Sequence, residues 1–220
     1  MVIGRRRVVP IVAGLAAPAV VGGCALATAL AYRGTTGEPY SPLNHWISEL
    51  GEVGVSRLAP VFNAGVVVGG TCLGVFMWSL ASARRGRLAR AYGRIGVVAG
   101  VAGALVGVFP MNRIVPHAIT STTFFNLATL AVALASVDFA VRPDARFGRA
   151  QAGVGAATAV AFAAFALVAA AAIQELGIAA LEAPAIRYDV MPIMTLEWAT
   201  LLGIMAWVLA TALAWAGTPR

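Results

Sequence analysis

Residues 58–83, LAPVFNAGVVVGGTCLGVFMWSLASA, form a run without a single charged side chain. An α-helix rises about 1.5 Å per residue, so about 20 apolar residues cross the ~30 Å hydrocarbon core of a bilayer. The run is long enough for that crossing. Because lipid offers no hydrogen bonds to an exposed backbone, a helix is the expected form. The run therefore predicts a transmembrane helix.

Similar uncharged runs recur along the whole chain. Hydrophobic residues make up 60% of the sequence and charged residues only 11%, whereas soluble proteins carry about 25% charged residues. We therefore predict an all-α integral membrane protein that forms a single domain over residues 1–220. Its six transmembrane helices are expected at about 8–32, 58–82, 93–109, 117–141, 151–173 and 195–216.

The charged residues between the runs predict an orientation. With a cytoplasmic N-terminus, the inner side carries twelve arginines and two acidic residues, a net charge of +10, and the outer side carries four arginines and seven acidic residues, a net charge of −3. Basic residues concentrate on the cytoplasmic side of membrane proteins. Both termini are therefore expected in the cytoplasm, and the protein in the cell membrane as a multi-pass protein of the bacterial inner membrane. Because the arginines follow this topology, no nucleic-acid partner is expected.

Glycines mark one face of the third predicted helix. They recur at alternating spacings of three and four residues, at Gly93, Gly96, Gly100, Gly103 and Gly107. Such stripes let helix backbones approach closely in lipid. We expect this stripe to pack against the glycines of the second helix within the chain. A homodimer through the stripes is the alternative, so the protein is expected to be a monomer or a homodimer.

The connection between the first two helices contains the segment NHWISELGE, residues 44–52. Leu43, Trp46, Ile47 and Leu50 follow a helical spacing and form one apolar face. The sequence therefore predicts a short amphipathic helix over about 42–51. It is too short to span the membrane and is expected to lie at the outer boundary with its apolar face toward the lipid.

Polar side chains from distant parts of the chain fall at the same depth as this segment. Four of them can transfer protons and are candidate catalytic residues: His45, Glu49, His117 and Glu197. Others are candidate ligand contacts: Asn44, Trp46, Ser48, Asn63, Asn112, Arg113, Ser121 and Asn126. Two histidines and a carboxylate also form a known metal-ligand set, and purely structural polar packing is a further alternative. No cofactor can be assigned.

Several short motifs follow one another as they do in a known family: Ile47-Ser48-Glu49-Leu50-Gly51, Phe62-Asn63, Phe109-Pro110 and His117. Over about residues 40–210 the chain resembles the bacterial and archaeal membrane family catalogued as domain of unknown function 998. It more distantly resembles the eukaryotic six-helix family that includes autophagy modulators and a glycolipid-anchor remodelling factor. The second resemblance implies a lipid substrate, and neither implies a particular activity.

The position of the polar groups suggests a function. We expect an outward-facing polar site that binds or modifies a lipid-like or other apolar substrate, in which case the protein is a membrane-embedded enzyme or binding protein. Membrane lipid and a lipid-like small molecule are the expected partners. A small-molecule transporter and a non-catalytic assembly or partner subunit are the alternatives.

Overall fold

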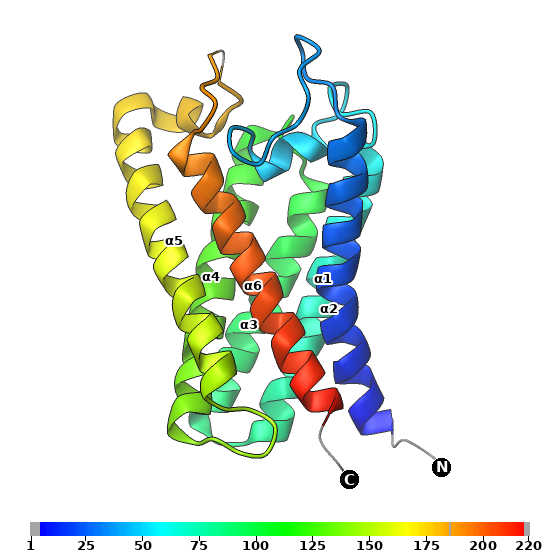
Figure 1. The fold of residues 1–220 in the computed structure, drawn as a ribbon, viewed down its shortest axis with the longest axis vertical. Coiled ribbons are helices and arrows are strands. Elements are labelled where there is room, and N and C mark those ends of the chain that lie inside the picture. Colours follow the sequence, from blue (N-terminus) through cyan, green and yellow to red (C-terminus); the bar gives the residue numbers. More distant parts are fainter. Residues whose placement is uncertain (1–4, 185, 218–220) are drawn as a thin grey trace.

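A computed structural model describes residues 5–184 and 186–217, and every regular element in these ranges is a helix. Six of these helices are long and apolar enough to cross a membrane, which confirms the predicted all-α membrane fold (Figure 1). The α-helices are α1 (Arg5–Ala31), α2 (Ala59–Arg84), α3 (Arg87–Val108), α4 (Ile114–Val141), α5 (Arg149–Leu176) and α6 (Pro192–Ala216). Two short 3₁₀-helices, η1 (Ile47–Gly51) and η2 (Gly177–Leu181), lie in the long connections.

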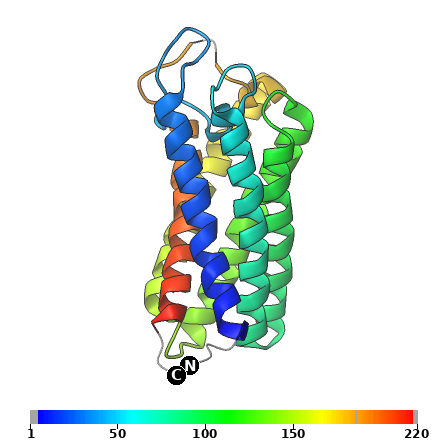
Figure 2. The same cartoon turned by 90° about the vertical axis from the view of Figure 1, so that its right-hand side faces the viewer.

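The six α-helices run up and down and close into a ring. Each helix packs on the next one along the chain, and α1 packs on α6. Helix α1 begins and α6 ends at the same end of the bundle, while η1 and the 177–191 connection cover the opposite end (Figures 1 and 2). Helix α5 is the most peripheral, because only Gly155 and Thr158 are buried along it. Which end faces the cytoplasm stays a prediction.

Glycines bring α2 and α3 into backbone contact, as the stripe predicts. A Cβ atom on Gly100 would lie 2.5 Å from the backbone nitrogen of Gly74, and one on Gly70 would lie 2.3 Å from that of Ala104. Farther along, a Cβ on Gly107 would lie 2.3 Å from the carbonyl oxygen of Asn63. The stripe is therefore occupied by intramolecular packing, and the oligomeric state stays a prediction.

Several helices start earlier than expected. Helix α3 begins at Arg87 rather than about residue 93, and α4 begins at Ile114 rather than 117. In α3 the first two turns carry Arg87, Arg90 and Arg94. Charged residues mark where a helix leaves the hydrocarbon core, but they are good helix formers and continue it beyond that boundary.

The end where the termini lie is closed by a buried ion cluster. Asp138 is fully buried; it accepts a hydrogen bond from the Nε atom of Arg84 at 2.9 Å and forms an ion pair with Arg142 one turn away. The Arg84 guanidinium also lies over the rings of Phe139 and Phe147, at 5.5 and 6.0 Å from their centres. Asp138 is thus paired with Arg142 from its own helix and with Arg84 from α2.

The Gly100→Ala substitution tests the α2–α3 contact. We expect it to lower the free energy of unfolding by about 1–3 kcal/mol, because its methyl group meets backbone that cannot rotate away. Gly23→Ala is the matched control, since Gly23 is an exposed helical glycine whose Cβ would have open space. Thermal unfolding in detergent should show a lower midpoint for Gly100→Ala only. Equal midpoints would contradict the close approach.

Candidate functional site

The segment between α1 and α2 folds into the end of the bundle where α1 ends and α2 begins, which we call the mouth. Only Ile47–Gly51 is helical, as the 3₁₀-helix η1, instead of the expected amphipathic helix over 42–51. Trp46, Ile47 and Leu50 are buried, and so are His45 and Glu49. The polar side chains of His45 and Glu49 therefore do not form an open face, and the position of the segment relative to the lipid stays a prediction. Its shape follows from bonds to side chains and loops far away in the sequence.

Glu49 holds this segment in place. Its carboxylate accepts hydrogen bonds from both terminal nitrogens of Arg187, at 2.6 and 3.2 Å, and from the backbone N–H of Trp46 at 2.8 Å. The Tyr32 hydroxyl donates a longer bond of 3.3 Å. Burial and the adjacent Glu49 carboxylate raise the pKa of Tyr32, so the phenol stays protonated and remains a donor. Glu49 is thus fully engaged by the protein itself.

His45 lies beside this ion pair and not in either of the cavities described below. It comes before the helical turn, so it does not share a helical face with Glu49 as expected. Its Nδ1 atom lies 2.7 Å from the side-chain oxygen of Asn44, and its ring contacts those of Tyr32 and Tyr40. Burial lowers the pKa of His45, so the neutral imidazole is favoured.

The second loop of this end is tied to the same segment. The Asn44 side-chain amide donates to the carbonyl of Tyr188 at 3.0 Å, and the Trp46 indole donates to that of Glu182 at 3.1 Å. The Met191 N–H donates to the Leu43 carbonyl at 2.7 Å, just before α6 begins. Asn44 and Trp46, expected as ligand contacts, thus have structural bonds, although Trp46 also lines a cavity.

Two cavities meet below this layer, and the residues they share form the polar junction: Ser48, His117, Ser121 and Glu197, with Phe125 beside them. Three elements supply these side chains, because η1 contributes Ser48, α4 contributes His117, Ser121 and Phe125, and α6 contributes Glu197. The sequence analysis named all four polar residues, and the structure brings them together. His45 and Glu49 belong to the separate layer above.

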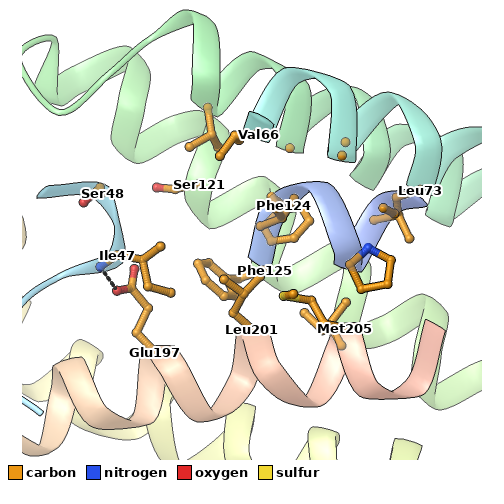
Figure 3. Close-up of a pocket in the computed structure, with 18 of the residues that line it drawn as sticks. Ile47, Ser48, Val66, Leu73, Ser121, Phe124, Phe125, Glu197, Leu201 and Met205 are labelled. Carbon is orange, nitrogen blue, oxygen red and sulfur yellow. Dashed lines mark hydrogen bonds between the residues drawn. The ribbon is translucent and has the colours of Figure 1, made fainter. Parts of the chain in front are cut away.

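Glu197 is the junction's carboxyl group. Its side chain is only 8% exposed, and its Oε2 atom accepts a hydrogen bond of 2.9 Å from the backbone N–H of Ile47 (Figure 3). Among the described residues no basic side chain forms an ion pair with Glu197. This one bond also fixes η1 over the start of α6, so the carboxyl group links the loop layer to the cavities.

His117 is held in one tautomer. Its Nδ1 atom lies 2.8 Å from the carbonyl oxygen of Phe109. A carbonyl oxygen only accepts, so Nδ1 carries the hydrogen and Nε2 of the neutral ring is an acceptor. His117 lines both cavities. A histidine and a carboxyl group at one junction can pass a proton to or from a molecule bound there.

The first cavity lies inside the ring of helices and has a volume of about 100 Å³. Its lining on α6 runs from Glu197 through Leu201 to Val208, which corresponds to about 16 Å along the helix axis. Apart from the polar junction its walls are apolar, with Leu73, Phe124 and Met205 among them (Figure 3). Its depth matches about half of the ~30 Å hydrocarbon core, the thickness of one leaflet.

The second cavity, of about 220 Å³, lies between α4, α5 and the start of α6. Trp46 and Phe125 line it, together with Phe165 and a run of alanines on α5. Its rim includes Asn126, whose exposed side chain donates to the Thr122 carbonyl one turn back. This cavity extends from the polar junction toward the loosely packed α5.

The other predicted contacts have structural roles. Asn63 donates to the Gly51 carbonyl at 2.9 Å, and a Cβ on Gly51 would overlap its side chain. The Asn112 amide both accepts from the Val53 N–H and donates to the Val53 carbonyl. The Arg113 side chain is exposed outside both cavities. Asn63 and Asn112 therefore clamp the chain after η1.

Sequence reasoning missed Arg187 and Tyr32 as partners of Glu49. They are 138 and 17 residues away from it, and no local spacing links them. The only available signal was that Arg187 is one of few arginines on the acid-rich side. For the metal alternative, no group of three or more His, Cys, Asp or Glu side chains within residues 5–184 and 186–217 is placed to hold a metal ion.

The fold and site define a multi-pass membrane protein with a polar junction between two apolar cavities. The chain belongs to the family described as Protein of unknown function (DUF998), whose family model matches residues 20–214. This confirms the resemblance to domain of unknown function 998, and the more distant resemblance to the eukaryotic family stays a prediction. No curated protein and no solved structure matches the chain.

Removing Arg187 should strongly destabilise the mouth. Arg187→Ala leaves the Glu49 carboxylate buried without its cation, and we expect a loss of about 3 kcal/mol in the free energy of unfolding. Arg57→Ala is the matched control, because Arg57 is an exposed arginine at the same end. Thermal unfolding in detergent compares them. An unchanged midpoint for Arg187→Ala would show that the ion pair does not hold the segment.

Acidification should destabilise the protein through His45. Because its folded pKa lies below the ordinary 6.5, the unfolded chain takes up the proton first. Stability is then lost as the pH falls below about 6.5, by at most about 1.4 kcal/mol per pH unit. His45→Gln should flatten this slope in thermal unfolding measured across that pH range. Glu52, whose pKa is raised by burial, titrates in both proteins and cancels in the comparison.

Proposed function

We propose that this membrane protein binds a lipid-like molecule with its hydrocarbon chain in the first cavity and its polar end at the junction. The observation that carries this proposal is the shape of the site. An apolar cavity of about one leaflet's depth ends at Ser48, His117, Ser121 and Glu197. Binding sites typically combine such apolar walls with a few convergent polar groups.

The second cavity provides the route of entry. It lies beside α5, whose side chains are buried only at Gly155 and Thr158. A molecule dissolved in the bilayer can pass between α4 and α5 without crossing the polar loop layer. The loops at this end are pinned over the mouth by Glu49 and Arg187, so entry from water is the more obstructed path.

Binding is favoured over conduction by the closed lower part of the bundle. Below the cavity lie the fully buried side chains of Phe76, Leu80, Phe139 and Trp207, followed by the Asp138 cluster. A transport path would need polar groups or space along that stretch. If the bound molecule is also modified, His117 and Glu197 are the residues placed to exchange a proton with it.

Substitution of one cavity residue tests the proposal. Leu201 is buried and lines the first cavity, whereas its neighbour Leu202 is 53% exposed and lies outside it. Leu201→Trp should fill the cavity, and Leu202→Trp is the matched control. In proteoliposomes, a long-chain alcohol bearing a photoactivatable diazirine should label the cavity walls of the wild type and of Leu202→Trp. We expect severalfold less cavity labelling in Leu201→Trp.

Peptide mass spectrometry locates the labelled residues, and size-exclusion chromatography confirms that each variant is folded. Val66→Phe repeats the test from α2 if Leu201→Trp does not fold, since Val66 also lines the cavity. Cavity labelling that persists at full strength in a folded, filled variant would overturn the proposal.

A further inference from the structure

The walls of the two cavities carry almost no charge. Among all the residues that line them, only His117 and Glu197 can ionise, and neither lining includes an arginine. The sequence contains no lysine. A carboxylate or phosphate group placed at the junction would therefore meet no cation. It would instead lie beside the carboxyl group of Glu197, and like charges brought together in a binding site cost several kcal/mol.

The hydrogen-bonding groups at the junction are mainly acceptors. The Ser48 hydroxyl donates to the sulfur of Met111 at 3.5 Å, and the Ser121 hydroxyl donates to the Ala118 carbonyl at 3.3 Å. Their remaining capacity is to accept. His117 has likewise committed its Nδ1 hydrogen to the protein, which leaves Nε2 as an acceptor.

Glu197 adds the strongest acceptor. The Ile47 N–H satisfies only one site of its Oε2 atom, while an ionised carboxylate offers about four lone-pair sites. Ionised carboxylates at membrane depth are usually paired. The nearby carboxylate of Glu49 already has Arg187 as its cation, and the side chain of Arg113 is exposed outside the cavities. If Glu197 is ionised, as it would be beside a bound cation, the described residues supply no counter-charge for it.

From these observations we infer that the ligand is an amphiphile with a primary ammonium group, held at Glu197 with its alkyl chain in the first cavity. This inference rests on the proposed function and names its ligand class. An ammonium group brings three N–H donors and one positive charge. Its three donors equal in number the acceptors that Glu197, His117 Nε2 and one serine hydroxyl offer among the residues shared by the two cavities. An alcohol brings one donor and no charge, and a fatty acid brings the wrong charge.

The charge of the residues around the site also favours a cationic ligand. The helix ends and connections at the cavity end carry four arginines and seven acidic residues, a net charge of −3, of which the buried Glu49 and Glu197 contribute −2. A net negative surface raises the local concentration of cations. At the opposite end, the described residues include eleven arginines and two acidic residues, a net charge of +9. Cationic amphiphiles therefore concentrate at the end that holds the site.

Competition binding with chains of one length tests this inference. Radiolabelled dodecylamine is bound to the purified full-length protein in maltoside micelles at neutral pH, and unlabelled dodecylamine, dodecanol and dodecanoate compete with it. We expect dodecylamine to compete about tenfold or more better than the other two. Lysophosphatidylethanolamine, which carries an ammonium and a phosphate, distinguishes a zwitterionic headgroup from a simple amine; competition by it extends the ligand class to such lipids.

Two charge-matched variants assign the effect to the junction. Glu197→Gln keeps an acceptor for the Ile47 N–H but removes the charge, and should bind dodecylamine about tenfold more weakly while its affinity for dodecanol stays the same. Glu175→Gln removes the same charge from an exposed residue at the same end and should bind like the wild type. Ser121→Ala, a milder change at the junction, should weaken amine binding if Glu197→Gln does not fold.

The results of the labelling and competition experiments distinguish a failure of the ammonium inference from a failure of the proposed lipid binding. Equal competition by all three chains, lost in Leu201→Trp, would overturn the ammonium class and leave lipid binding intact. Equal weakening in Glu175→Gln and Glu197→Gln would also overturn it, because surface attraction alone would then explain the preference. If the diazirine alcohol labels the cavity of Leu201→Trp as strongly as that of the wild type, the proposed function itself is overturned.

Discussion

The arrangement of the site depends on the buried ion pair between Glu49 and Arg187. Through it, η1 is fastened to the loop before α6, and through Tyr32 it is fastened to the end of α1. A buried carboxylate that lost these partners would be strongly destabilising. The pair therefore fixes the position of Ser48 and Ile47, the two residues that η1 contributes to the cavities.

The two glutamates near η1 serve opposite purposes although they lie close together. Glu49 is surrounded by donors and has a cation of its own, so it has nothing left to offer a ligand. Glu197 has a single bond from the backbone and lines two cavities. Because both carboxyl groups are almost completely buried, they differ in their unsatisfied hydrogen-bonding capacity and not in their exposure.

Sequence reasoning predicted the membrane fold well because hydrophobic runs act locally. It also predicted the glycine contact of α2 with α3, since a regular spacing on one helix fixes a face. It failed at η1, where the 42–46 stretch is shaped by bonds to Glu182 and Tyr188 rather than by its own periodicity. It grouped His45 with His117 because the depth of a residue along the membrane normal can be read from the sequence. Whether a residue at that depth lines a cavity or belongs to the loop layer depends on long-range contacts.

Each end of the bundle contains a buried carboxyl group, and the two groups have different partners. The two ends are therefore not equivalent. Asp138 is neutralised by Arg84 and Arg142 inside an aromatic shell, so that end needs nothing from outside the chain. Glu197 lies at the top of an apolar cavity, and none of the salt bridges within residues 5–184 and 186–217 involves it. Because a lone buried charge is costly in a membrane, the fold tolerates it most easily where a ligand can supply the missing charge. Under the proposed function, a molecule bound there would enter and leave through the same half of the bilayer, as a lipid-binding site requires and a channel does not.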